Sequence, residues 1–123
     1  MKVRANLYIE YDSAEDLTAI QWDKLPQPVL NIGEGSNLLF TKDFPGTVLH
    51  SGIKGMDVVE QMSSGDDLFV RVGAGVIMDD FCDWAARKEV WGPENLSAIP
   101  GTVGAAPVQN IGAYGVEAAD IID

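Results

Sequence analysis

The segment from residue 31 to residue 40 reads NIGEGSNLLF and combines glycines with small hydrogen-bonding side chains. Gly33 and Gly35 can adopt left-handed backbone conformations without a steric penalty. In such a turn, consecutive backbone N–H groups can point inward and surround an anion, and Ser36 and Asn37 add neutral donors. The segment therefore suggests a binding loop for a pyrophosphate, although an ordinary hairpin turn would explain the same residues equally well.

A second segment, from Ile99 to Gly115, is long, nearly uncharged and rich in small residues. Its glycines permit a flat group to approach the backbone closely, its aliphatic side chains offer apolar contact, and its amides can bond the edge of a heterocycle. These residues are Gly101, Gly104, Gly112, Ala105, Ala106, Val108, Ile111, Gln109 and Asn110. Together the two segments predict a dinucleotide cofactor, with its phosphates on the first and its ring on the second.

A third glycine pair, Gly73 and Gly75, follows an expected strand and precedes an expected helix, as in a dinucleotide-binding fingerprint. Met78 stands where that fingerprint needs its third glycine, and Glu94, the acid at the expected distance, falls in a loop. We therefore interpret this pair as a tight strand-to-helix turn. The sequence also lacks a GxxxxGK[ST] phosphate-binding loop.

The composition limits the class of partner. The 123 residues carry 19 acidic side chains against 8 Lys and Arg, a net charge of −11. Such a surface repels nucleic acid and anionic lipid, so an anionic ligand must be met locally by backbone N–H groups. The single cysteine excludes an internal disulfide, and neither a membrane-length apolar run nor a signal-peptide core is seen. A soluble cytoplasmic protein is expected.

The first half of the chain has the pattern of a β-α-β-β unit. Ser13 begins a short helix in a capping pattern with Asp16, and Pro26 and Pro28 prevent its continuation. Strands are expected at residues 6–11, 29–32 and 47–50, with a further strand-like piece at 38–40 and a turn at 43–46.

The second half begins with two expected strands, residues 56–62 and 68–72, joined by a hairpin at 63–67. Residues 77–88 have the period of an amphipathic helix, with one face formed by Ile77, Phe81, Trp84, Ala85 and Lys88. Residues 91–115 have no clear period, and residues 116–123 resemble a strand.

The remaining reactive side chains favour structural roles. His50 is a lone histidine in a strand without a visible partner for acid–base chemistry, and Cys82 is expected to be an inert, partly buried thiol. Glu94 and Asn95 suit a helix-to-loop turn. The acidic residues at the start of the helix, Asp79, Asp80 and Asp83, lack the spacing of a calcium loop, so no metal site is predicted.

Three segments, GEGSNLLF, VGAG and PENLSAIPGTVGAAPVQNIGAYGVE, occur in an order and spacing that resembles the UDP-N-acetylenolpyruvoylglucosamine reductases of bacterial peptidoglycan synthesis. The resemblance begins near Asn6 and spans only part of the family's usual length. It implies an α+β fold, an FAD-binding domain of the vanillyl-alcohol-oxidase/PCMH type. Residues 1–51 would form a small β-α-β-β lobe, and residues 52–123 part of a second, mainly antiparallel α+β lobe. The substrate-binding domain would be absent.

The resemblance also implies FAD as bound cofactor, NADPH as hydride donor, and UDP-N-acetyl-enolpyruvoylglucosamine as the parent's substrate. The pyrophosphate would be held by Gly33, Glu34, Gly35, Ser36, Asn37 and Leu38. The isoalloxazine and its linker would be lined by Ile99, Pro100, Gly101, Gly104, Ala105, Ala106, Gln109, Ile111 and Gly112. Tyr114 would face the substrate.

The family's catalytic serine, glutamate and arginine lie in segments that this sequence does not contain, so no catalytic residue is expected here. The chain is expected to be a part of the reductase that is inactive by itself. Two alternatives remain open from the sequence: a stand-alone flavin- or nucleotide-binding module without redox activity, and another oxidase of the same fold. The sequence predicts no oligomeric state.

Overall fold

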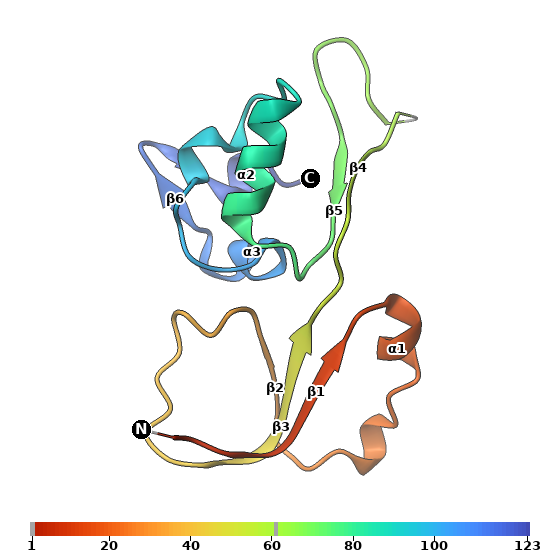
Figure 1. Cartoon of the computed structure of the whole chain (residues 1–123), viewed down its shortest axis with the longest axis vertical. Helices are drawn as coiled ribbons and strands as arrows, with labels where there is room; N and C mark the ends of the chain where they lie inside the picture. The colour runs from red at the N-terminus through yellow and green to blue at the C-terminus, as the bar shows by residue number, and fades with distance from the viewer. Residues whose placement is uncertain (1, 61) are drawn as a thin grey trace.

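The computed structural model describes residues 2–60 and 62–123. Figure 1 shows two parts, a three-stranded sheet from the N-terminal residues and a second part around helix α2. The first part holds β1 (Ala5–Tyr11), α1 (Ala14–Thr18), a 3-10 turn (Trp22–Lys24), β2 (Val29–Ile32) and β3 (Phe44–Ser51). The second holds β4 (Met56–Val58), β5 (Val70–Val72), α2 (Met78–Arg87), α3 (Ala106–Gln109), β6 (Gly112–Ala113) and β7 (Val116–Glu117), with 3-10 turns at Pro93–Leu96, Val103–Ala105 and Ala118–Asp120.

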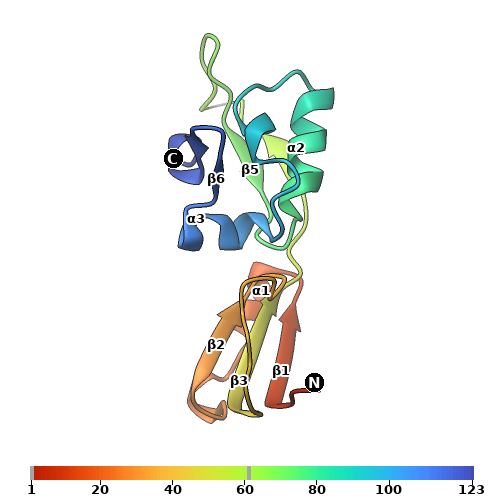
Figure 2. The same ribbon diagram turned by 90° about the vertical axis from the view of Figure 1, so that its left-hand side faces the viewer.

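The first sheet has the strand order β1-β3-β2, and both of its pairings are parallel. Parallel strands cannot be joined by a tight hairpin. Each connection must therefore carry the chain from one end of the sheet back to the other. Residues 12–28, including α1, connect β1 to β2, and residues 33–43 connect β2 to β3. The central strand is the most buried, with Thr47, Val48 and Leu49 at most 6% exposed. Figure 2 shows the three strands side by side beneath the second part.

Most local predictions in this half are confirmed. The strands at 6–11, 29–32 and 47–50 are present, and the Ser13 side chain accepts a hydrogen bond from the Asp16 N–H. The strand-like piece at 38–40 and the turn at 43–46 are wrong. Residues 38–40 lie in the crossover and have no neighbouring strand to pair with. The strand β3 already begins at Phe44, inside the predicted turn. Its pairing with β1 shifts register between Ala5 and Leu7, which lie opposite Phe44 and Thr47.

The second half has antiparallel strand pairs instead. The hairpin predicted between 56 and 72 is confirmed, but each strand pairs over three residues only; Gln61, within the predicted strand, lies outside the described residues. The predicted strand at 116–123 is wrong beyond Glu117. Glu117 and Asp120 form a capping box there, which starts a 3-10 turn and buries Ala118 completely.

The core of this half lies between α2 and the segments that follow it. Its buried members are Met78, Cys82, Leu96, Ala106 and Ala118. The helix expected at 77–88 is confirmed, but its buried face is rotated from the predicted one: of the five predicted residues only Ala85 is buried, and Lys88 is exposed. Within the described part of the chain, no helix has the length and apolar character needed to cross a membrane.

We expect the Cys82 thiol to resist alkylation in the folded protein at pH 8. The side chain is 4% exposed, its Sγ donates to the Pro93 carbonyl, and burial, with added repulsion from Asp79 and Glu94, raises its pKa to about 11. Because the thiolate is the reactive form, the native thiol is both inaccessible and protonated. A thiol-reactive chromogenic reagent measures this; equal labelling rates in buffer and in urea would contradict it.

Candidate binding cleft

A cleft of about 270 Å³ lies where the sheet meets the second half of the chain. Figure 1 shows the loop after β2 rising from the sheet toward α3. The cleft brings together thirteen residues that the sequence predicted for one site: Gly33, Glu34, Gly35, Ser36, Asn37, Leu38, Pro100, Gly101, Gly104, Ala105, Ala106, Gln109 and Ile111. The two glycine-rich segments therefore face one space.

Two direct contacts join these segments. Asn37 Nδ2 donates to Gln109 Oε1 over 2.8 Å. A Cβ atom placed on Gly33 would lie 2.8 Å from Ala105 Cβ and 2.9 Å from Thr102 Oγ1. Any side chain at position 33 would separate the two segments, so the close approach requires glycine.

The turn after β2 has the backbone geometry that an anion-binding loop needs. Gly35 has φ +72°, and the Leu38 N–H donates to the Gly35 carbonyl over 3.2 Å. The backbone N–H groups of Gly35, Ser36 and Asn37 donate to no residue that the structure describes. A Cβ atom on Gly35 would meet no described atom within 4 Å. The turn thus presents consecutive N–H donors beside open space.

Seven further residues line the cleft, and of these the sequence had indicated only Val108, as an apolar contact: Tyr11, Asn31, Ile32, Ser51, Ala74, Thr102 and Val108. Tyr11 and Thr102 line the cleft although the residues are only 6% and 3% exposed. Neither hydroxyl has a hydrogen-bond partner among the described residues, and each therefore has bonding capacity for a ligand in the cleft.

Three of these residues lie at the carboxyl ends of the parallel strands, a position that could have been predicted from the sequence. Tyr11 and Ser51 are the last residues of β1 and β3, and β2 ends at Ile32. Ligands of parallel sheets bind outside the carboxyl ends of the strands. That rule would have selected these positions, but only once the strands were known to be parallel.

Four predicted residues do not line the cleft. Ile99 packs against the core that contains Leu96, and Gly112 pairs with Glu117 in the β6–β7 ladder. Tyr114 is 92% exposed, with φ +54°. Asn110, expected to bond a heterocycle, is engaged within the chain: its Nδ2 donates to Glu117 and its Oδ1 accepts from the Ala119 N–H.

The cleft holds little charge. Glu34 is the one charged residue among the described lining residues, and no Lys or Arg is among them. An anion bound there would be held by neutral donors and would lie beside a carboxylate.

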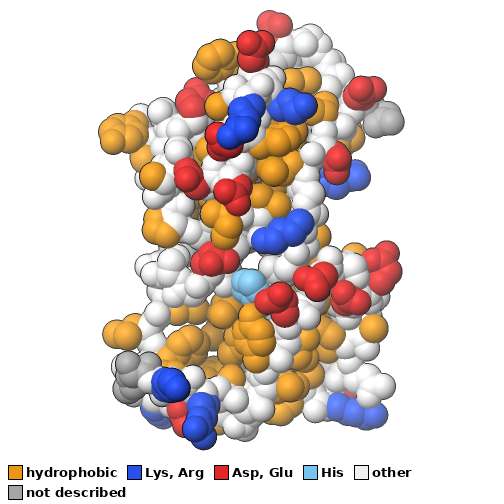
Figure 3. All heavy atoms as spheres, in the orientation of Figure 1, with side chains coloured by type: hydrophobic (Ala, Val, Ile, Leu, Met, Phe, Trp, Pro, Cys, Tyr) orange, Lys and Arg blue, Asp and Glu red, His pale blue; other side chains and the backbone are white. Residues whose placement is uncertain are grey.

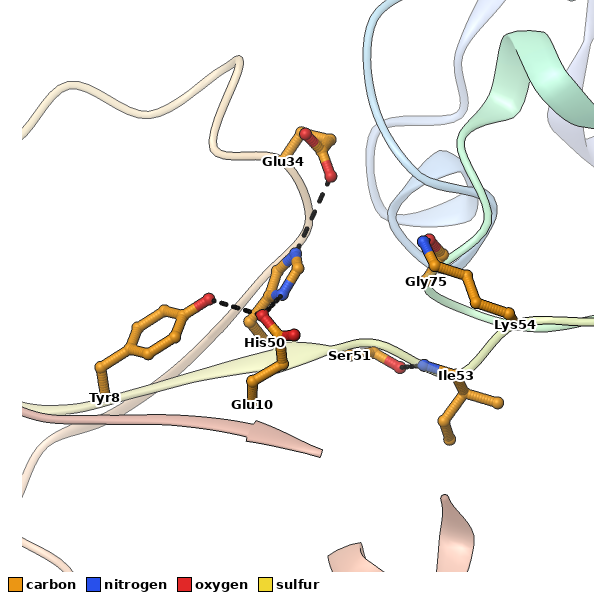
Figure 4. A network of polar contacts seen from close by, with 8 residues as sticks. All are labelled: Tyr8, Glu10, Glu34, His50, Ser51, Ile53, Lys54 and Gly75. Carbon is orange, nitrogen blue, oxygen red and sulfur yellow. Dashed lines mark hydrogen bonds and ion pairs between the residues drawn. The ribbon is translucent and has the colours of Figure 1, made fainter. Parts of the chain in front are cut away.

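Figure 4 shows that His50 lies between two carboxylates, which corrects the expectation that it has no partner. Its Nδ1 is 3.0 Å from Glu10 Oε2, and its Nε2 is 3.9 Å from Glu34 Oε1. The Tyr8 hydroxyl donates to the same Glu10 oxygen over 3.2 Å. Burial, then this bond and the charges of Glu10 and Glu34, raise the pKa of Tyr8 above its ordinary value.

Two of the acids near α2 have structural partners. Asp79 Oδ1 accepts from Ser97 Oγ and the Ala98 N–H, and these bonds lower the pKa of Asp79. Glu94 accepts from the Gly92 N–H, in agreement with a turn function. Within the described part of the chain, no group of three His, Cys, Asp or Glu side chains is placed to hold a metal ion.

Comparison with known proteins gives consistent matches. The family described as FAD binding domain matches residues 6–123. The UDP-N-acetylenolpyruvoylglucosamine reductase of Bacteroides fragilis is 54% identical over 98% of this chain and 36% of the relative. The corresponding reductases of Porphyromonas gingivalis and Chromobacterium violaceum are 45% and 47% identical, each over 98% of the chain and over 36% and 35% of the relative. The chain thus spans little more than a third of the length of these curated relatives.

Proposed function

Because the chain belongs to the FAD-binding domain family, we propose that its cleft binds FAD. The observation that carries this proposal is the turn at residues 33–38, which lines the same cleft as the small-residue segment 100–111 and in which the N–H groups of Gly35, Ser36 and Asn37 have no partner among the described residues. The hydroxyls of Tyr11 and Thr102, which lack a partner among the described residues, support it, because a dinucleotide offers both acceptors and donors to such groups.

We assign the diphosphate to the turn and the isoalloxazine with its linker to the second segment. Neutral N–H donors suit a diphosphate in a protein of net charge −11, since they add no cation that the surrounding acids would neutralise. Gly101 and Gly104 allow a flat ring to approach, and Gly104 itself packs on Ala74 so closely that a Cβ would lie 2.7 Å from the Ala74 Cβ. Ile99 and Gly112 support this segment from the core and from the β6–β7 ladder.

At the level of fold, we propose an FAD-binding domain of the vanillyl-alcohol-oxidase/PCMH type with one lobe at residues 1–51 and part of a second at 52–123. Two features support this division. The parallel sheet is built wholly from residues before 52, and the antiparallel pairs and α2 come wholly from residues after it.

For the whole protein from which this sequence derives, we propose the activity that its relatives' name denotes. FAD, when bound, supplies the means to accept a hydride from NADPH and deliver it to the enolpyruvyl group of UDP-N-acetyl-enolpyruvoylglucosamine, giving UDP-N-acetylmuramate for peptidoglycan in the cytoplasm. Residues of this chain hold and orient that cofactor. We assign no catalytic proton donor to them, so the chain alone is expected not to complete the reduction. Tyr114, exposed beside this segment, is our candidate substrate contact.

The purified chain is expected to bind FAD saturably and FMN at least about tenfold more weakly. FMN lacks the diphosphate bridge, and hydrogen bonds to charged groups contribute roughly 1.5–3 kcal/mol each. A titration followed by flavin fluorescence measures both affinities, with far-UV circular dichroism to verify folding. A folded chain that binds neither flavin, or both equally, would contradict the assignment of the turn to a diphosphate.

A further inference from the structure

The imidazole of His50 lies at the contact between the sheet and the turn that we assign to the diphosphate. Glu10 reaches its Nδ1 from β1, and Glu34 approaches its Nε2 from the turn, over 3.0 and 3.9 Å (Figure 4). The His50 side chain is 18% exposed, against 51% for Glu10 and 43% for Glu34. The ring is therefore the least exposed member of a chain of three ionisable groups.

A neutral imidazole cannot satisfy both carboxylates. It carries a single N–H, so the nitrogen without a proton presents a lone pair to the remaining carboxylate. With the proton on Nδ1, the short contact to Glu10 is satisfied and Nε2 faces the Glu34 oxygens without a hydrogen. Only the doubly protonated, positively charged ring can attract both acids.

The titratable groups that face His50 come from two segments of the chain. From β1 these are Tyr8 and Glu10, and from the segment after β2 Glu34; Ile32, the β2 residue paired with His50, is apolar. Tyr8 remains a neutral donor to Glu10, because its pKa lies above the ordinary value. His50 is the sole histidine of the chain, and histidine is the side chain whose ordinary titration falls between pH 5 and 8.

Figure 3 shows the imidazole at the surface between acidic side chains, close to where the two parts of the chain meet. Its partner Glu34 is the one charged residue among the described residues of the cleft. A negative carboxylate beside a bound diphosphate opposes binding, and a neighbouring cation offsets that repulsion. We propose that protonation of His50 neutralises Glu34 and thereby strengthens the binding of the anionic dinucleotide; this inference rests on the proposed function of the cleft.

The test is a set of FAD titrations of the full chain at pH 6, 7 and 8 at constant ionic strength. Wild-type affinity is expected to fall roughly five- to tenfold from pH 6 to pH 8, within the limit of tenfold per pH unit for one linked proton. In His50→Gln the affinity is expected to stay near the wild-type value at pH 8 throughout. In Glu34→Gln the affinity at pH 8 is expected to be several-fold higher than in the wild type, because the repelling charge is gone.

A matched control removes one exposed carboxylate elsewhere. Glu60→Gln, beyond β4 and away from the cleft, leaves the wild-type pH dependence intact if the effect is local to Glu34. The N-terminal amine also titrates near neutral pH and is present in every variant. A change of FAD affinity with pH that all variants share is therefore assigned to that amine. Circular dichroism at each pH verifies folding, and the exposed Glu34 variant gives the answer if His50→Gln is unstable.

The outcomes separate the two proposals. Wild-type affinity that is constant between pH 6 and 8, a slope that persists in His50→Gln, or an affinity of Glu34→Gln at pH 8 no higher than that of the wild type overturns the role of His50 while the FAD assignment stands. Absence of FAD binding by the folded wild type at every pH overturns both. A slope that is present in the wild type and Glu60→Gln but lost in His50→Gln, together with a higher affinity of Glu34→Gln at pH 8, supports the proposal.

Discussion

Replacing Gly35 with valine is expected to weaken FAD binding at least about 100-fold while the chain still folds. Gly35 has φ +72°, a conformation that costs an L-residue roughly 1–2 kcal/mol and a β-branched one more. Valine therefore draws the turn into another conformation, and the N–H groups of Gly35, Ser36 and Asn37 no longer converge. Losing even two hydrogen bonds to a charged diphosphate, at roughly 1.5–3 kcal/mol each, accounts for this factor.

The chain contains a matched control for this substitution. Gly65 has φ +60° in the turn between β4 and β5, and, as at Gly35, a Cβ there would meet no described atom within 4 Å. Gly65→Val imposes comparable backbone strain away from the cleft and should leave the FAD dissociation constant unchanged. Fluorescence titrations and urea denaturation of both variants are the measurements. Wild-type flavin affinity in Gly35→Val would refute the assignment of the diphosphate to this turn.

Truncating Leu96 to alanine is expected to have the largest effect on stability, a loss of about 2–5 kcal/mol in the free energy of unfolding. Leu96 is fully buried and belongs to the cluster of Met78, Cys82, Ala106 and Ala118. Three of these neighbours are small, and Leu96 has the largest of the fully buried side chains in the described part of the chain. Removing it leaves a cavity beneath the segment that lines the cleft.

Urea denaturation of Leu96→Ala beside Leu39→Ala measures this effect. Leu39 is 88% exposed in the crossover loop, so its truncation should change stability by no more than about 0.5 kcal/mol. Equal losses in the two variants would show that the described core does not hold this half together. FAD affinity measured below the unfolding transition is expected to fall in Leu96→Ala, because Ala106 belongs to both the core and the cleft.

Local chemistry explains where sequence reasoning succeeded. The Ser13 cap, the glycine turn before α2 and the hairpin at 63–67 depend on residues within a few positions of one another, and all three are present. One error arose where a distant segment decides the outcome, and the other where a local capping pattern was overlooked. Residues 38–40 have strand composition but no neighbouring strand, and residues 116–123 leave the strand at Glu117 because Asp120 and Glu117 cap each other.

The sequence by itself determined which two segments would line one cleft, because glycine, serine, asparagine and small apolar residues at those spacings favour turns and close approach whatever surrounds them. Only the tertiary structure decided the rest of the cleft. The parallel order β1-β3-β2 places Tyr11 at its edge, Asn37 meets Gln109 across 72 residues, and His50 comes between Glu10 and Glu34. Contacts between residues so far apart depend on how whole elements pack, and no local backbone preference encodes them.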